Sequence, residues 1–375
     1  MRTPSRTIAF RITTWTVALT VLVIGPAELL PPPAACTTFC LTDGTSVVFG
    51  RNYDWDFGDG LIVVNKGGVA KSAASGIREG AETPARWESK YGSVTFNQYG
   101  REFPTGGMNE KGLVVELMWL EDTVYPRGDS RPAVSVLEWI QYQLDRYASV
   151  KELLAHAEEI RIAGKVPLHY LVADRTGAAA TIEFLEGRLK THTGKTLPVA
   201  VLTNDTYERS VASLGRYEGF GGDQPPPSGR SSLARFARTA AMVGSDAAQR
   251  RKPLSDYAFD VLASAAQGDH TRWSIVYEPT SARIRFRTWN CKDIRSLALS
   301  SFDFSCATPV KVLDVMAPLQ GEVAGRFTDY TLEANLDLIA GSYRQVPFLA
   351  SVPRSEIEAV ARHPEGMSCN VPAPR

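Results

Sequence analysis

Cys36 is the residue whose place in this sequence points most directly to chemistry. Three arginines among the first eleven residues precede an apolar run at 12–24, and a Pro-Pro-Pro-Ala-Ala stretch ends at Ala35. This order of charged, apolar and small residues is typical of a secretory signal peptide. Cleavage after Ala35 would leave Cys36 at the new N-terminus, carrying both a thiol and an α-amine.

A cysteine with a free α-amine brings a nucleophile and a base together on one residue. A thiol titrates near ~8.5 and an α-amine near ~7.7–8.0, so the neutral amine can take the thiol proton directly or through a water. We therefore predict that Cys36 is a catalytic nucleophile that needs no histidine. Two other interpretations stay open here: a structural cysteine, or a lipid-carrying one. Pro33 disfavours the second, because lipoprotein signals normally carry a leucine-like residue there.

Composition limits the partners of the chain. The sequence has 375 residues with 41 basic and 41 acidic side chains. Removing residues 1–35 takes away three arginines and one glutamate, which leaves 38 basic and 40 acidic residues. This near-neutral balance disfavours nucleic acid or an anionic membrane as a partner. No later apolar run approaches the ~20 residues that span a bilayer, so we expect a periplasmic or secreted protein and one catalytic domain over 36–375.

Export would place the four remaining cysteines in an oxidising compartment. Cys40, Cys291, Cys306 and Cys369 allow three pairings, and Cys291 with Cys306 would close the shortest loop. Neither these cysteines nor the five scattered histidines show the spacing of zinc ligands. The sequence also lacks the glycine-rich phosphate-binding and dinucleotide-binding motifs. We therefore expect no metal and no cofactor.

The hydrophobic pattern predicts strands, then helices, and then strands and helices again. Strands are expected at 37–41, 46–52, 61–65, 93–97 and 112–120, at 169–174, 178–186, 188–193 and 199–205, and at 273–278, 283–288 and 295–298. Helices are expected at 133–146, 150–160, 233–242, 255–265 and 329–339. The uniformly apolar 112–120 strand should be central in its sheet, and the residues from about 330 on should form a surface extension. This order predicts an α+β fold, a four-layer αββα sandwich of two antiparallel sheets flanked by helices.

Arg51 and Asp54 follow Cys36 on the second predicted strand. One reverse turn, at Asp43-Gly44, would place both residues beneath the thiol. Arg51 would favour the thiolate, and Asp54 could accept hydrogen bonds from the α-amine.

Together with these residues, the chain resembles the choloylglycine hydrolase family of N-terminal nucleophile (Ntn) hydrolases, which contains penicillin V acylases and conjugated bile acid hydrolases. The resemblance covers nearly all of the chain after Cys36. The matching blocks are Cys36 itself, GRNYD at 50–54, MNEKGL at 108–113, LHYLVADRTG at 168–177, VLTN at 201–204 and LARFAR at 233–238.

The resemblance implies a role for each of five residues. Cys36 matches the nucleophile, Arg51 and Asp54 match its flanking pair, Asn204 matches the oxyanion-hole side chain, and Arg235 matches the second arginine. An amide N–H of Asn204 could stabilise a tetrahedral oxyanion. Arg235 could compensate the charge of a buried Asp54.

Two tryptophans set this chain apart from many family members. Trp119 stands where many members have an asparagine, and Trp55 follows Asp54 directly. We expect both indoles to line an apolar acyl pocket, because tryptophan offers a large rigid face. Tyr53, Tyr125 and Tyr207 are weaker candidates for the same pocket. The two tryptophans resemble the Gram-negative penicillin V acylases more than the intestinal bile-salt enzymes.

These inferences predict an amidase that cleaves the linear amide of a small-molecule N-acyl substrate through a thioester. Penicillin V, N-acyl homoserine lactones and bile-acid conjugates are the candidate substrates, with the first two favoured. Two alternatives remain: a ceramidase-like or N-acylethanolamine-type amidase, and a lipid-anchored binding protein without catalysis. The resemblance also suggests a homotetramer.

Overall fold

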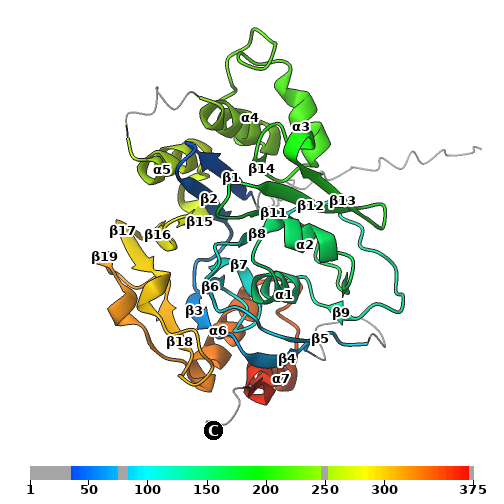
Figure 1. Ribbon diagram of the computed structural model, residues 1–375, viewed down its shortest axis with the longest axis vertical. Coiled ribbons are helices and arrows are strands. Elements are labelled where there is room, and N and C mark those ends of the chain that lie inside the picture. Colours follow the sequence, from blue (N-terminus) through cyan, green and yellow to red (C-terminus); the bar gives the residue numbers. More distant parts are fainter. Residues whose placement is uncertain (1–34, 75–82, 246–251, 371–375) are drawn as a thin grey trace, which may run out of the picture. The chain divides into compact units, whose positions relative to one another are not determined.

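Two large β-sheets lie at the centre of the computed structural model, which describes residues 35–74, 83–245 and 252–370 (Figure 1). The first sheet has seven strands, in the order β14 (Val201–Leu202), β1 (Thr37–Thr42), β2 (Val47–Asp54), β15 (Thr271–Glu278), β16 (Arg283–Thr288), β17 (Cys291–Ala298) and β19 (Gly321–Glu322). The second has nine, in the order β13 (Arg188–Thr193), β12 (Ala179–Leu185), β11 (Leu168–Ala173), β8 (Val114–Trp119), β7 (Pro104–Asn109), β6 (Ser93–Asn97), β3 (Leu61–Asn65), β18 (Lys311–Asp314) and β20 (Thr328–Asp329). Neighbouring strands are antiparallel except β17 with β19.

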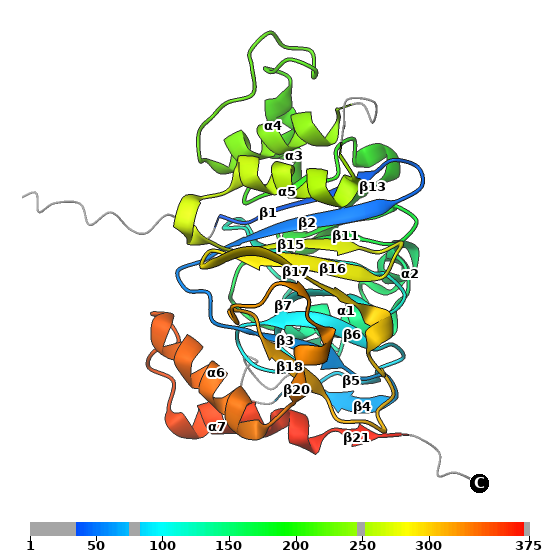
Figure 2. The same ribbon diagram turned by 90° about the vertical axis from the view of Figure 1, so that its left-hand side faces the viewer.

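Helices cover the outer faces of both sheets. The first sheet is covered by α4 (Ser232–Val243) and α5 (Leu254–Ala265), with α3 (Tyr207–Leu214) beside them, and the second by α1 (Glu138–Arg146) and α2 (Val150–His156). Figure 2 shows these layers from the side. The predicted α+β sandwich is confirmed. Within the described parts of the chain, no helix is both long and apolar enough to cross a membrane.

Strand β2 is covered on both faces, and all eight of its residues are buried. Because side chains alternate along a strand, Arg51 points to the second sheet, where it contacts Thr105, while Asn52 donates to the Leu262 carbonyl of α5. Gly50 is required here, since a Cβ at this position would overlap the Phe39 ring. The predicted central strand is also confirmed, because β8 lies between β7 and β11 in the nine-stranded sheet.

Two helix boundaries differ from the prediction. α1 begins at Glu138 and not at residue 133, because β9 (Ala133–Val134) pairs in parallel with β10 (Arg161–Ile162). The same pairing explains why α2 ends at His156, short of the predicted residue 160. Its predicted start is confirmed, since the Ser149 side chain accepts from the Glu152 N–H as an N-cap.

The C-terminal segment, expected as a surface extension with one helix, packs firmly on the rest of the domain. It contains α6 (Leu332–Gln345) and α7 (Arg354–Arg362), which share a hydrophobic cluster with Phe103. The predicted helix is thus present but displaced towards the C-terminus. Beyond α7, β21 (Ser368–Cys369) joins β4 (Val69–Ser72) and β5 (Arg86–Glu88) in a three-stranded sheet.

A disulfide ties this end of the chain to the domain. Cys306 bonds to Cys369 across 63 residues of sequence, whereas Cys40 and Cys291 are free thiols. The shortest-loop pairing of Cys291 with Cys306 is therefore wrong. Sequence proximity is a weak guide here, because the pairing of β21 with β4 brings the distant Cys369 to Cys306.

We expect the Cys306→Ser variant to lose about 2–4 kcal/mol of unfolding free energy, because the disulfide restricts the unfolded chain. Urea unfolding of the oxidised proteins measures this loss. Cys291→Ser is the matched control and should stay within about 0.5 kcal/mol of the parent. Equal stabilities of the Cys306→Ser variant and the oxidised parent would contradict the prediction.

Candidate active site

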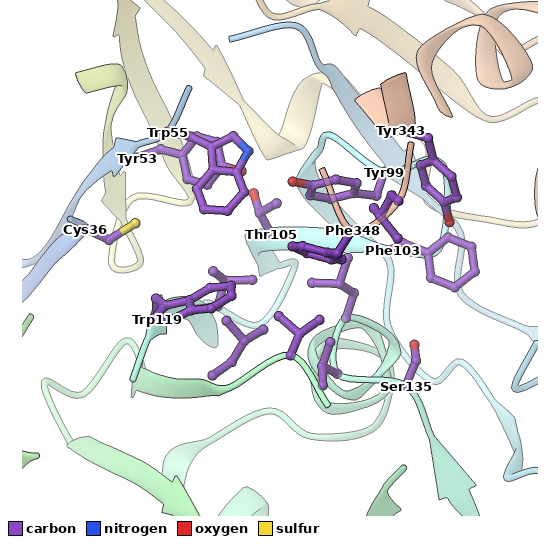
Figure 3. A pocket seen from close by; sticks show the side chains of 16 residues that line it. Cys36, Tyr53, Trp55, Tyr99, Phe103, Thr105, Trp119, Ser135, Tyr343 and Phe348 are labelled. Atoms are coloured by element: carbon purple, nitrogen blue, oxygen red, sulfur yellow. The ribbon is translucent and has the colours of Figure 1, made fainter. Parts of the chain in front are cut away.

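Cys36 lies directly before β1, at one end of an apolar cavity (Figure 3). Its side chain is 1% exposed, and Figure 3 shows the sulfur directed between Trp55 and Trp119. The next residue, Thr37, pairs with Asn52 across the β1–β2 hairpin. The predicted reverse turn therefore brings Arg51 and Asp54 close to Cys36.

Arg51 is fully buried between the two sheets and forms an ion pair with Glu116 of β8. Its Nη1 also donates to the Thr105 carbonyl at 3.0 Å, and its guanidinium lies 4.7 Å from the centre of the Tyr53 ring. These contacts hold a permanently charged group beside Cys36.

Glu116 is a component of the site that the sequence analysis missed. Its other carboxylate oxygen accepts a hydrogen bond of 2.5 Å from the Tyr277 hydroxyl. A Cβ at Gly106 would overlap this carboxylate, so glycine on β7 leaves room for it. Burial raises the pKa of Glu116 to about 7 although Arg51 acts in the opposite direction. The sequence contained one indication of this role, because Glu116 is a charged residue inside the apolar run 112–120. A charge in such a run needs a buried partner.

Asp54 ends β2 and is fully buried. Its Oδ1 accepts from the Thr271 hydroxyl, while its Oδ2 has no hydrogen-bond partner among the described residues. Burial raises the pKa of Asp54 to about 7, against the smaller opposing effects of Thr271, Arg235 and Arg51. The unpartnered oxygen gives the site an acceptor for one more donor.

The raised pKa of Asp54 predicts a pH dependence of stability for a chain in which Ala35 still precedes Cys36. Because the folded state favours the protonated acid, this stabilisation is complete below about pH 4 and lost as the pH rises through about 7. An Asp54→Asn variant lacks this titration, so its stability relative to the parent should rise by up to about 4 kcal/mol between pH 4 and 8. Urea unfolding across this range measures the difference. A constant difference would contradict the prediction.

Asn204 and Arg235 form a chain of hydrogen bonds that reaches the backbone of Cys36. The Asn204 Nδ2 donates to the Trp119 carbonyl at 2.9 Å, and its Oδ1 accepts from Nη2 of Arg235 at 2.8 Å. Nη1 of Arg235 donates to the Cys36 carbonyl and, at 2.8 Å, to the Thr37 hydroxyl. All five predicted catalytic residues therefore meet in one place.

A second network holds the segment that carries Asn204. The His169 ring lies 2.7 Å from the Thr203 carbonyl and 3.3 Å from Glu183, through its Nε2 and Nδ1 atoms respectively. Glu183 also accepts from the Tyr207 N–H at 3.0 Å, at the start of α3. The contacts of His169 and Glu183 thus hold Thr203 and Tyr207, which lie on either side of Asn204 in the sequence.

The electrostatics at the Cys36 sulfur favour the neutral thiol while Cys36 stays in a peptide linkage. Burial raises the pKa of the thiol, and the lowering effects of Arg51 and of the Asp54 backbone N–H are smaller. Arg51 thus acts in the predicted direction but does not outweigh burial. Part of its charge is also compensated by Glu116.

The cavity beside Cys36 has a volume of about 140 Å³ and is almost entirely apolar. The Trp55 and Trp119 rings line it with their centres 6.3 Å apart, as the sequence predicts for a pocket wall. Tyr53 also lines it and stacks on Trp55, whereas Tyr125 and Tyr207, the other two tyrosines expected there, are not among its lining residues. Lining residues that the sequence analysis missed include Tyr99, Phe103, Leu117, Val136, Leu168 and Phe348.

Comparison with known proteins agrees with this geometry. Residues 36–246 match the sequence profile of the family described as linear amide C–N hydrolases, choloylglycine hydrolase family. The chain belongs to this family. The expected amidase class and Ntn-hydrolase fold are thereby confirmed.

Penicillin V acylase of Pectobacterium atrosepticum is 28% identical to this chain over 248 residues, which are 60% of this chain and 63% of that protein. The alignment thus spans less than two thirds of that relative. The solved structure of penicillin V acylase from Agrobacterium tumefaciens superposes with a TM-score of 0.68 at 26% identity, covering 79% of this chain and 98% of that one. A mutant of conjugated bile acid hydrolase from Clostridium perfringens shares the fold, with a TM-score of 0.61 at 17% identity over 74% of this chain and 96% of that one.

Proposed function

We propose that this family member is an exported N-terminal cysteine amidase in which Cys36, released by cleavage after Ala35, attacks N-acyl amides. The observation that carries the proposal is the convergence of Arg51, Asp54, Asn204 and Arg235 on a buried cysteine at the end of an apolar cavity. The family match also begins at Cys36. We place the enzyme in the periplasm or outside the cell.

In the acylation step the Cys36 sulfur forms a bond to the amide carbonyl carbon while its proton passes to the α-amine of the same residue. The carbonyl oxygen becomes an oxyanion, which the Asn204 amide stabilises. This amide has two N–H groups, one of which donates to the Trp119 carbonyl in the structure. The C–N bond then breaks, the α-ammonium returns its proton to the leaving amine, and a thioester remains.

In the second step water attacks the thioester, with the α-amine again acting as the base. The C–S bond breaks, the carboxylic acid leaves, and the thiol is restored. The unpartnered Oδ2 of Asp54 supports this scheme, because it can accept a hydrogen bond from the α-amine and so orient it. Such a partner would also lower the pKa of Asp54 from its value in the uncleaved chain.

The cavity favours an apolar acyl group. Its indoles and its size match a single aromatic ring, since an engineered cavity of ~150 Å³ in another protein binds benzene. Penicillin V, whose acyl group is phenoxyacetyl, is therefore the first substrate to test. N-acyl homoserine lactones and bile-acid conjugates complete the panel.

The proposal is tested by comparing a protein that starts at Cys36 with one that keeps Ala35 in front of it. Losing the α-amine base should lower kcat for penicillin V by roughly 10²–10⁴-fold. The intact mass of the exported protein shows its true N-terminus. A diacylglyceryl adduct on Cys36 would contradict the proposal. So would equal activity of the two forms.

Asn204→Ala should lower kcat by roughly 10²–10³-fold and change KM little, because the amide acts mainly on the oxyanion. Steady-state kinetics with penicillin V measure both constants. The control is Ser232→Ala, which removes the hydroxyl that accepts from the Asn204 backbone N–H and leaves the side-chain amide in place. A change in KM alone in the Asn204 variant would assign Asn204 to ground-state binding.

A further inference from the structure

The cavity beside Cys36 continues into a second cavity of about 790 Å³. Walls common to both cavities include Trp119, Val136, Val166, Tyr343 and Phe348. The nucleophile therefore faces an inner chamber, and the outer chamber lies beyond it.

The sizes of the two chambers imply different contents. The inner chamber, at about 140 Å³, is close to the volume that holds one benzene ring. The outer chamber falls within the ~300–1,000 Å³ usual for small-molecule sites. An acyl group longer than an aryl ring would therefore extend from the inner chamber into the outer one.

One wall of the outer chamber comes from the C-terminal segment. Tyr343 lies on α6, Phe348 and Val352 lie between α6 and α7, and Val360 lies on α7. Phe348 is 55% exposed and is one of three exposed large hydrophobic residues in the described regions. Figure 3 shows it in the cavity near Thr105 and Phe103. An exposed aromatic ring that faces a cavity gains free energy when an apolar ligand covers it.

This wall is anchored to the domain. The Ser342 hydroxyl donates to the Gln98 carbonyl at 2.6 Å, and the Asn335 amide donates to the Ala361 carbonyl at 3.0 Å. Ile339 and Ala361 are fully buried in the cluster shared by α6, α7 and Phe103. These contacts fix the position of α6 and α7, and so of the wall that they form.

The side chains that line the outer chamber indicate which kind of ligand it can bind. Apolar side chains from Val166, Val352 and Val360 line it, while Lys165, Glu356 and His363 add polar groups. Such a lining suits a flexible hydrocarbon chain that passes apolar surface and ends near polar groups.

Building on the proposed function, we propose that the α6–α7 segment forms a second acyl subsite that binds the distal part of a long alkyl chain. The substrate class of the site is then long-chain N-acyl amides, and Phe348 is a specificity-determining residue at the junction of the two chambers. Each methylene buried beyond the inner chamber should raise kcat/KM by up to about fourfold.

The test measures kcat/KM for amides of one amine with phenoxyacetyl, hexanoyl, decanoyl and tetradecanoyl groups. The parent enzyme should show rising values from hexanoyl to tetradecanoyl. Ala359→Trp, which adds an indole to the outer chamber, should lower the tetradecanoyl value at least tenfold more than the phenoxyacetyl value. Phe348→Ala should flatten the dependence on chain length. Val124→Ala is the control, since this exposed residue lies outside both chambers.

Binding of tetradecanoate to the Cys36→Ser protein, followed by calorimetry, gives a readout that does not depend on turnover. Tight binding that Ala359→Trp weakens at least tenfold would support the subsite even if no amide were cleaved, in which case only the proposed function would fail. If the parent and both variants hydrolysed the amides with the same dependence on chain length, the subsite proposal would be wrong. The proposed amidase function would not be affected. Tetradecanoate binding that Ala359→Trp leaves unchanged would also overturn it.

Discussion

Replacing Cys36 with serine is expected to lower kcat for amide hydrolysis by at least about 10³-fold, because the variant loses the sulfur nucleophile. A hydroxyl is far less acidic than a thiol, so the α-amine of the same residue cannot activate it equally well. The two side chains differ little in size, and the Cys36 pocket should accept serine without disturbing the fold. Steady-state kinetics with penicillin V measure the loss.

The controls for this variant are the other two free thiols. Cys40 is buried, and burial raises its pKa to about 12, so it is unreactive at neutral pH. Cys291 is half-buried on β17, which is separated from β1 by β2, β15 and β16 in the sheet. Cys40→Ser and Cys291→Ser should each retain most of the activity. Retention of more than about a tenth of kcat in Cys36→Ser would refute Cys36 as the nucleophile.

Replacing Glu116 with alanine should destabilise the protein by about 3–5 kcal/mol, because it leaves the buried Arg51 guanidinium without its counter-charge. Activity should fall as well, since the same contact holds Arg51 beside Cys36. Urea unfolding and kcat/KM on the same preparations measure both effects. Glu116→Gln, which keeps a hydrogen-bonding group of the same shape, should lose less stability than Glu116→Ala.

Tyr277→Phe is a matched control for the Glu116 variants. It removes the other hydrogen bond to the carboxylate and keeps the charge, so its cost should be only about 1–3 kcal/mol. If Glu116→Ala were as stable as the parent, Arg51 would have to find another partner or leave the interior. The ion pair would then have no part in the structure of the site.

The features that the sequence predicted well depend on local pattern or on the order of the short blocks that resemble the family. The β1–β2 hairpin needs only the turn at Asp43-Gly44, and it places Arg51 and Asp54 near Cys36 without help from distant residues. Asn204 and Arg235 came from the family resemblance, and the structure places them within one hydrogen-bond chain. Their catalytic roles stay predictions.

The features that the sequence could not predict depend on contacts between distant residues. Glu116 is explained only by Arg51, 65 residues before it. The start of α1 is set by the pairing of β9 with β10, which overrides the helical pattern of residues 133–137. Tyr343, Phe348 and Leu349, from the C-terminal part of the chain, line a cavity whose other walls come from residues 36–168. No local period signals such contacts.

The hydrogen bonds around Cys36 bear on the proposed cleavage after Ala35. Arg235 donates a hydrogen bond to the carbonyl oxygen of Cys36. That oxygen belongs to the peptide bond between Cys36 and Thr37, which a cut after Ala35 would leave intact. The same holds for the pairing of Thr37 with Asn52. The proposed cleavage after Ala35 would thus break none of these contacts. The strands around Cys36 would not need to rearrange for the α-amine to become free.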